Sequence, residues 1–160
     1  MVIISKQVPT FSRRGCDMSI WPRGAPMVGA SASRSRTVSA EDIERFSQIT
    51  GDYNPLHYDE AAATASRFGG IIVQGGITSG ILNAVVAEDL PGPGTVFLKT
   101  EWSYLAPVRP GDEITGMVEV LDVRTDKPVA TLRTTVSRGD GVIVLDGTAQ
   151  TYTVPLGELG

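Results

Sequence analysis

The sequence predicts an α+β domain in which one long buried helix precedes a run of antiparallel strands. The segment over 77–90 has apolar or small residues around most of its helical circumference, so it leaves almost no polar face for solvent. After residue 94, stretches rich in β-branched and aromatic residues alternate with short turns of proline, glycine and aspartate. A sheet wrapped around the helix would bury it, and the open edges of that sheet favour a dimer.

Composition narrows the classes of function. The chain has 160 residues, enough for one core. Its formal net charge is −4 and its pI is about 4.9, which argue against a nucleic-acid partner. No apolar run is long enough to span a bilayer, and the one cysteine, Cys16, cannot form an internal disulfide. We therefore expect a cytoplasmic protein without a membrane partner.

The charge is distributed unevenly along the chain. Residues 1–40 contain six basic residues and one acid, whereas residues 41–160 contain eight basic and seventeen acidic residues. We interpret residues 1–32 as a basic irregular arm and residues 33–160 as a single domain. An arm rich in arginine and serine is also compatible with organelle targeting, or with a misplaced start site.

The first regular elements lie just after this arm. A short extended segment over 34–38 leads to Ser39, which with Asp42 resembles a capping box at the start of a helix. Gly51 is positioned to end that helix in a left-handed conformation. The face that we expect to be buried carries Ile43, Phe46, Ser47 and Ile49.

A long irregular excursion follows over 51–70. Asn54 precedes Pro55 and is disfavoured in helical geometry, so a turn is expected there. A short helix over 59–66, capped by Asp59, breaks at the following glycines. Irregular excursions of this length inside a compact domain are often functional.

The second half of the chain is predicted to be four strands. They span 95–106, 114–124, 129–137 and 142–154, and are joined by turns at 107–112, 125–127 and 139–141. Within 129–137, apolar and polar residues alternate as in a half-buried strand.

His57 is the only histidine, and it lies in the irregular excursion five residues after Asp52. A lone histidine is by default a structural or surface residue. A carboxylate nearby in sequence and a stiff turn at Pro55 raise the hypothesis of an acid–base pair.

The sequence contains few of the residues that other types of catalytic site require. One histidine and one distant cysteine do not make a zinc site, so no metal is expected. Cys16 with His57 as nucleophile and base remains open, but Cys16 has no helix start beside it. Ser79 is not in a Gly-x-Ser-x-Gly elbow, although counting residues does not exclude a serine triad.

Two glycines, Gly75 and Gly76, directly precede the long helix in this reading. Backbone N–H groups at a helix start are unpaired and sit at the positive end of the helix dipole. The glycines therefore predict either an oxyanion-binding corner or simply a tight entry to the helix.

The run Phe46–His57, with its Gly-Asp-Tyr-Asn-Pro-Leu-His element, resembles the MaoC-like, (R)-specific enoyl-CoA hydratase family of hot-dog folds. The resemblance continues through Ile72–Gly75, the Pro-Gly turn at 91–94 and Ala106–Glu113, and covers roughly residues 33–155. It implies a hot-dog fold, a long central helix wrapped by an antiparallel sheet, paired as a homodimer with one continuous sheet.

The resemblance also implies roles for individual residues. Asp52 and His57 match the residues that hold the catalytic water, and the N–H of Gly75 matches the donor to the thioester oxygen. The residues expected to bind substrate are Asn54, Gln74, Gly76 and Asn83. Gln74 stands where the family commonly has histidine, and Asn83 where it commonly has serine, which predicts retained chemistry in a reshaped pocket.

The predicted activity is reversible hydration of a trans-2-enoyl thioester to an (R)-3-hydroxyacyl thioester. The acyl group would be carried on CoA or on an acyl carrier protein, and neither a metal nor another cofactor is required. Two alternatives on the same fold are a non-catalytic subunit that binds acyl thioesters and a thioesterase.

Overall fold

The computed structural model describes residues 20–156, so Cys16 and most of the predicted basic arm lie outside the described residues. In chain order the elements are β1 (Ser31–Thr37), α1 (Ala40–Thr50), α2 (Pro55–Tyr58), α3 (Glu60–Ala65), α4 (Gly75–Ala84), the π-helical turn η1 (Val85–Asp89), β2 (Thr95–Tyr104), β3 (Glu113–Val123), β4 (Val129–Arg138) and β5 (Ile143–Thr153). Each strand predicted after residue 94 is present, with bounds that differ by at most two residues.

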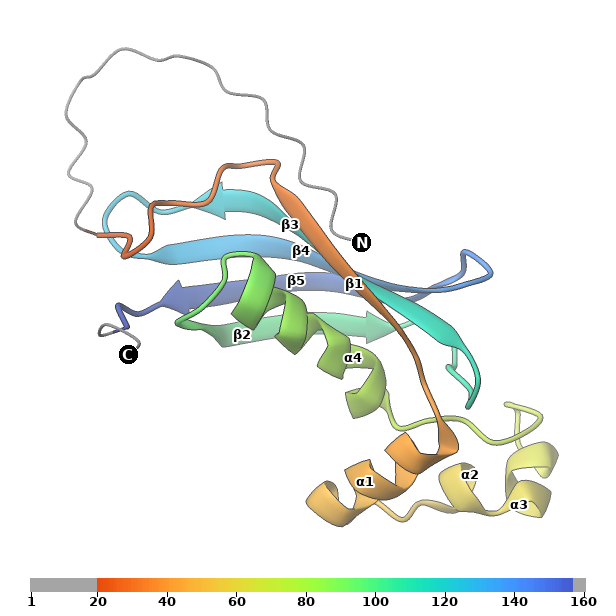
Figure 1. Cartoon of the computed structure of the whole chain (residues 1–160). Helices are drawn as coiled ribbons and strands as arrows, with labels where there is room; N and C mark the ends of the chain where they lie inside the picture. The colour runs from red at the N-terminus through yellow and green to blue at the C-terminus, as the bar shows by residue number, and fades with distance from the viewer. Residues whose placement is uncertain (1–19, 157–160) are drawn as a thin grey trace.

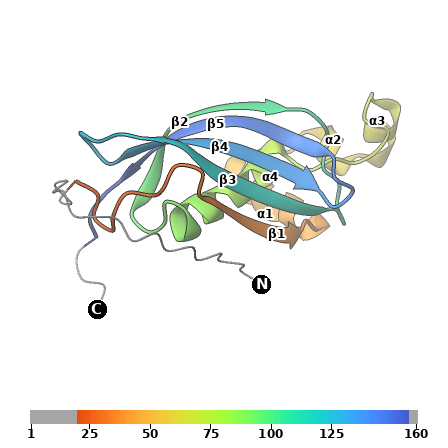
Figure 2. The same ribbon diagram turned by 90° about the horizontal axis from the view of Figure 1, so that it is seen from above.

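The five strands form one antiparallel sheet in the order β1-β3-β4-β5-β2. The sheet curves over α4, which lies along one of its faces, while α1, α2 and α3 gather at one end (Figures 1 and 2). Sequential pairing places β3, β4 and β5 in the middle of the sheet, and β1 and β2 form the two edges.

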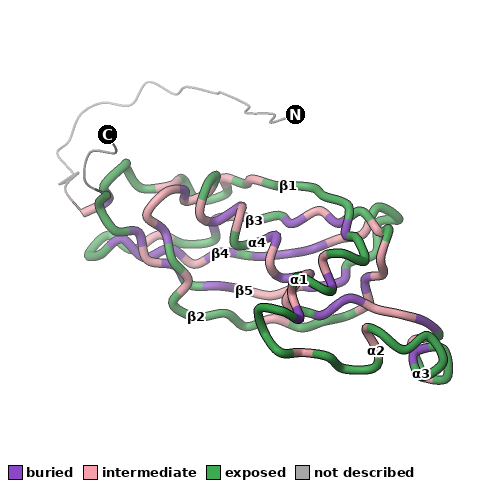
Figure 3. Tube along the Cα trace, turned by 60° about the horizontal axis from the view of Figure 1, so that its bottom comes forward, coloured by how far each residue is buried: buried purple, intermediate pink, exposed green. Residues whose placement is uncertain are grey.

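Buried side chains from α4 and the central strands make the core. Leu82 and Val85 are fully buried, and the buried stretches of the chain concentrate in α4, β3, β4 and β5 (Figure 3). A Cβ on Gly116 of β3 would lie 2.6 Å from Ile81, so glycine is what lets the helix approach the sheet this closely. This contact fixes the depth at which α4 lies on the sheet.

The central helix differs from its prediction in two ways. It begins at Gly75, so both glycines are its first residues, and its last turn is π-helical, with the N–H of Leu90 donating to the carbonyl of Val85. It is also not buried all round, because Asn83 is exposed in the single chain. One side of α4 faces away from the sheet.

The capping box on α1 is confirmed. Ser39 Oγ accepts from the Asp42 N–H, Asp42 accepts from the Ser39 N–H at 2.8 Å, and Gly51 ends the helix at φ 76°. Ile43 and Ser47 are buried as expected, but Ile49 is 84% exposed. At about 100° per residue, Ile49 lies roughly 240° around the helix from Ile43, which puts it on the opposite side.

The packed chain begins ahead of the predicted boundary at residue 33. Trp21 is 8% exposed within the core cluster, and its Nε1 donates to the carbonyl of Arg124 at 3.2 Å. The N–H of Gly29 donates to Val120, and β1 starts at Ser31. The described part of the arm therefore belongs to the domain.

Over residues 20–156, none of the helices combines the length and the apolar character that a membrane crossing requires.

We predict that Asp42→Asn lowers the free energy of unfolding by about 1 kcal/mol at neutral pH. Burial alone would raise the pKa of Asp42, but hydrogen bonds from the Ser39 N–H and Arg36 outweigh it, so the pKa is lower than usual. A carboxyl whose pKa is lower in the folded state stabilises the fold at neutral pH and loses this effect as the pH falls through the folded-state pKa. Urea unfolding of both proteins at neutral pH and at about pH 3 measures this.

Glu41→Gln is the control, because Glu41 pairs with Arg45 on the exposed side of the same turn. Equal stabilities of wild type and Asp42→Asn at neutral pH would contradict the assignment.

Candidate active site

Asp52 and His57 face each other across the turn between α1 and α2. His57 Nε2 lies 3.6 Å from Asp52 Oδ2, with the histidine side chain 9% exposed and the carboxylate 41% exposed. Asp52 Oδ1 accepts from the Asn54 N–H at 3.2 Å, and Asn54 Oδ1 accepts from the Leu56 N–H at 3.0 Å. Two successive side-chain-to-backbone turns, followed by Pro55 at the start of α2, thus orient the pair.

The carbonyl of Ile72 sets the tautomer of His57. His57 Nδ1 lies 2.7 Å from this oxygen. A carbonyl only accepts, so Nδ1 carries the proton, and in the neutral ring Nε2 presents its lone pair towards Asp52. The histidine is therefore arranged as a proton acceptor at the atom that faces the carboxylate.

The separation of 3.6 Å between Nε2 and Oδ2 is longer than a direct hydrogen bond. A single water or hydroxyl oxygen beside both atoms could bond to each of them. Together they can take a proton from that oxygen or return one to it.

The start of α4 supplies a different kind of group. Gly75 and Gly76 are its first residues, so helix geometry gives their N–H groups no intrahelical acceptor. Within the described part of the chain, the Gln74 side chain makes no capping hydrogen bond to them. This end of a ten-residue helix is suited to a developing negative charge.

The segment before α4 connects its start to the pair. Ile72 accepts from His57, and two residues later Gln74 Nε2 lies 3.5 Å from the carbonyl of Asp52. Arg109 donates to the carbonyl of Ile71 at 3.1 Å and also to that of Phe68, which holds the loop ahead of this segment. Figure 1 shows α1, α2 and the start of α4 at one end of the sheet, and these elements and the turn between α1 and α2 carry Asp52, His57 and Gly75.

Gln74 is placed differently from our expectation of a substrate contact. It is 1% exposed, and its Nε2 donates to Ser47 Oγ at 2.9 Å. In the single chain, a side chain buried in this way has almost no surface for a substrate to contact.

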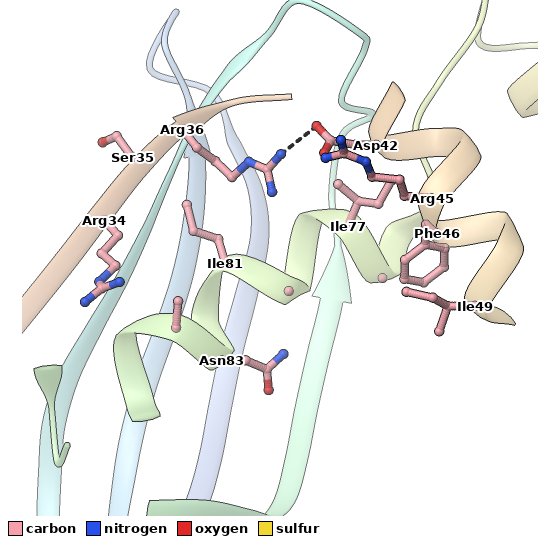
Figure 4. A pocket seen from close by; sticks show the side chains of 13 residues that line it. Arg34, Ser35, Arg36, Asp42, Arg45, Phe46, Ile49, Ile77, Ile81 and Asn83 are labelled. Atoms are coloured by element: carbon pink, nitrogen blue, oxygen red, sulfur yellow. Dashed lines mark hydrogen bonds and ion pairs between the residues drawn. The ribbon is translucent and has the colours of Figure 1, made fainter. Parts of the chain in front are cut away.

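Gly76 and Asn83 line a cavity of about 580 Å³ between β1, α1 and the exposed side of α4 (Figure 4). Its floor is apolar, with Phe46, Ile77 and Ile81. Asp52 and His57 are not among its lining residues, and Ile49, three residues before Asp52, is the lining residue nearest to the pair along the chain. Asn54 lies outside it and uses its side-chain oxygen to cap α2.

Three arginines at the edge of this cavity are already neutralised. Arg34 pairs with Asp89, Arg36 with Asp42, and Arg45 with Glu41. The cavity therefore offers little net charge, and its shape and apolar floor are its main features.

Sequence reasoning missed several groups at the site. Ser47 was expected to be buried, and a polar residue on a buried helix face was the signal that it has a partner. The sequence carried no such signal for Tyr58 or Tyr104, because their contacts come from other segments of the chain. The ring of Tyr104 packs over Gly75.

In the described residues, no three histidine, cysteine or acidic side chains cluster in a way that could hold a metal.

We predict opposite effects on stability for two alanine substitutions along α4. A Cβ on Gly76 would lie 2.2 Å from Phe46 Cζ, so Gly76→Ala must displace that ring and should cost about 1–3 kcal/mol. A Cβ on Gly80 meets no described atom within 4 Å, so Gly80→Ala should gain about 0.5–1 kcal/mol of unfolding free energy from helix propensity. Urea unfolding of the two variants tests this, and a stable Gly76→Ala protein would refute the close packing.

Comparisons with known proteins show which family the chain is similar to. Residues 25–140 match the family model for the MaoC like domain. The (R)-specific enoyl-CoA hydratase of Aeromonas caviae is 36% identical over 122 residues, which cover 76% of this chain and 91% of the relative. The 3-hydroxybutyryl-CoA dehydratase of Methylorubrum extorquens is 40% identical over 122 residues, covering 76% and 77%.

Solved structures give the same result. The (R)-hydratase from A. caviae involved in PHA biosynthesis superposes with a TM-score of 0.77 at 34% identity, over 81% of this chain and 98% of that one. An (R)-hydratase from Pseudomonas aeruginosa gives a TM-score of 0.75 at 31% identity, over 88% and 94%. The predicted hot-dog fold and the resemblance in sequence are confirmed, and the chain belongs to the MaoC-like dehydratase family.

Proposed function

We propose that this chain catalyses the reversible hydration of a trans-2-enoyl thioester to an (R)-3-hydroxyacyl thioester, carried on CoA or on an acyl carrier protein. The observation that carries the proposal is the Asp52–His57 pair, with His57 Nε2 turned towards the carboxylate by the Ile72 carbonyl. The names of the relatives, an enoyl-CoA hydratase and a hydroxybutyryl-CoA dehydratase, support the same reaction class.

The chemistry divides between the pair and the helix start. Asp52 and His57 hold a water and remove a proton from it as its oxygen bonds to C3 of the enoyl group. Electron density moves to the thioester oxygen, where the Gly75 N–H and the dipole of α4 stabilise the enolate. The pair then delivers a proton to C2 and returns to its starting protonation state, so the sum is addition of one water.

We predict that purified protein removes the enone absorbance of crotonyl-CoA, and that Asp52→Asn and His57→Ala each reduce kcat/KM by at least about 100-fold. Asp140→Asn is the control, because Asp140 is an exposed carboxylate in the β4–β5 hairpin. Enoyl groups of several lengths, on CoA and on acyl carrier protein, give the substrate range.

Release of free thiol with an unchanged double bond would identify a thioesterase instead. A wild-type protein that converts neither short, long nor branched enoyl thioesters would contradict the proposal and favour the non-catalytic subunit.

We also infer that the protein is a homodimer joined through β2. This edge strand carries exposed apolar side chains, with Val96 53% and Leu98 58% exposed, whereas the opposite edge strand, β1, exposes serine, arginine and threonine. An unpaired edge with apolar side chains is a site for strand pairing, and pairing two β2 strands would extend the sheet across both chains.

We predict that light scattering during gel filtration gives twice the 17.0 kDa mass of the chain. Leu98→Glu should shift the protein to monomer, because a charge would be buried in the paired edge. Leu121→Glu, which alters an exposed leucine on β3, should remain dimeric. A wild-type protein that is monomeric at micromolar concentration would refute pairing through β2.

A further inference from the structure

The hydroxyl of Ser47 is buried and lies at the centre of a hydrogen-bond cluster beneath the Asp52–His57 pair. Ser47 Oγ donates to the carbonyl of Asp52 at 2.6 Å. It accepts from Tyr58 Oη at 2.6 Å and from Gln74 Nε2 at 2.9 Å. Ser47, Tyr58 and Gln74 are referred to below as the Ser47 cluster.

This arrangement uses the whole hydrogen-bonding capacity of the serine. A hydroxyl has one proton to donate and two lone pairs to accept with, and all three are engaged. Ser47 and Gln74 are buried, whereas Tyr58 is 41% exposed, so solvent does not reach the serine end of these bonds. The direction of its one donated bond is therefore fixed, and it points at the main chain of Asp52.

The cluster joins the three segments that build the site. Ser47 comes from α1, Tyr58 ends α2 and follows His57 directly, and Gln74 precedes Gly75 at the start of α4. Each member is thus adjacent in sequence, or bonded, to a residue proposed to act on the substrate. A shift in any one segment would stretch a bond to the same oxygen.

Gln74 is held in place despite a cost. Its Nε2 also approaches the carbonyls of Ile43 at 3.4 Å and Asp52 at 3.5 Å, so the amide nitrogen faces only acceptors. Its Oε1 is buried and finds no partner among residues 20–156. An unpaired buried carbonyl lowers the stability of the fold, and an apolar residue of similar size would avoid this loss. The donor function of Nε2 is what distinguishes glutamine from such a residue.

Tyr58 is suited to be a donor. Loss of solvent around its hydroxyl raises the pKa of Tyr58, the hydrogen bond with Ser47 opposes this, and the carboxylate of Glu44 raises it further. The phenol therefore stays protonated at neutral pH and keeps its proton for Ser47, the nearest of its acceptors.

We propose that Ser47, Tyr58 and Gln74 are positioning residues. They hold the Asp52 main chain so that its carboxylate keeps its distance from His57 Nε2 and its position relative to the start of α4. The proposal rests on the proposed hydratase function for its effect on rate, but its effect on geometry can be measured without activity.

The kinetic test uses Ser47→Ala, Tyr58→Phe and Gln74→Met in the full chain. We expect kcat for the enoyl thioester to fall about 10- to 100-fold in Ser47→Ala and Gln74→Met, with KM changed less than about twofold, because misplacement affects the chemical step more than binding. Tyr58→Phe should have a smaller effect in the same direction. Ser47→Thr, which keeps the hydroxyl, should restore much of kcat.

The double variant Ser47→Ala/Gln74→Met separates positioning from general destabilisation. Both changes act through one oxygen, so the loss in kcat should be close to that of Ser47→Ala alone, well short of the product of the two losses. Melting temperatures measured in parallel set the assay temperature below unfolding for every variant. Gln48→Met and Thr64→Val are matched controls for the lost amide and hydroxyl, since both residues are exposed and bond only to nearby glutamates.

A spectroscopic test uses the fact that His57 is the only histidine in the chain. In untagged protein its ring nitrogens give a single set of ¹⁵N signals, and Asp52→Asn defines the Nε2 shift without the carboxylate. Ser47→Ala and Gln74→Met should move the Nε2 signal towards that value, while Gln48→Met should leave it at the wild-type position.

These outcomes separate the two proposals. An inactive wild-type protein in which Ser47→Ala still moves the His57 signal would reject the hydratase function and keep the cluster. Wild-type kcat and an unmoved His57 signal in folded Ser47→Ala and Gln74→Met would overturn the cluster.

Discussion

The packing of α4 against the curved sheet is the constraint on which the rest of the structure depends. The helix has too few polar residues to stand in solvent, so the sheet must bend over it, and Gly116 sets how closely they approach. Once α4 is fixed at that depth, its first turn is fixed as well. The start of α4 at Gly75, which we propose as the oxyanion donor, is thus placed by core packing.

The acidic and basic groups of the site are then brought to that helix start by backbone-directed hydrogen bonds. The Ile72 carbonyl holds the ring of His57, and the Asn54 N–H holds the carboxylate of Asp52. Main-chain atoms have few alternative positions in a packed domain, so bonds to them orient a side chain more firmly than bonds between two side chains would. The chemistry that we propose for the pair therefore relies on fixed geometry, which acid–base catalysis at one water requires.

Local signals were enough to predict much of this from the sequence. Ser39 with Asp42, Gly51 at the end of α1, and the alternating strands are short-range patterns, and all were found where expected. The Gly-Asp-x-Asn-Pro-x-His element placed Asp52 and His57 on one turn. What the sequence could not supply were contacts between distant segments, such as Tyr104 over Gly75 or Gln74 beneath Asp52. The burial predicted for Ile49 was wrong, because the prediction used its hydrophobicity and not its angle around the helix.

Trp21 lies at the end of the sheet opposite the entrance to α1. Its indole bonds beside the last residue of β3, whereas the first residue of β3, Glu113, pairs with Thr37 at the entrance to α1. Eleven residues of extended strand separate these points by roughly 30 Å. The described chain thus enters the domain, at Ile20, at the end of the sheet opposite the entrance to α1, so contacts around Trp21 can change without touching the turn that carries the Asp52–His57 pair.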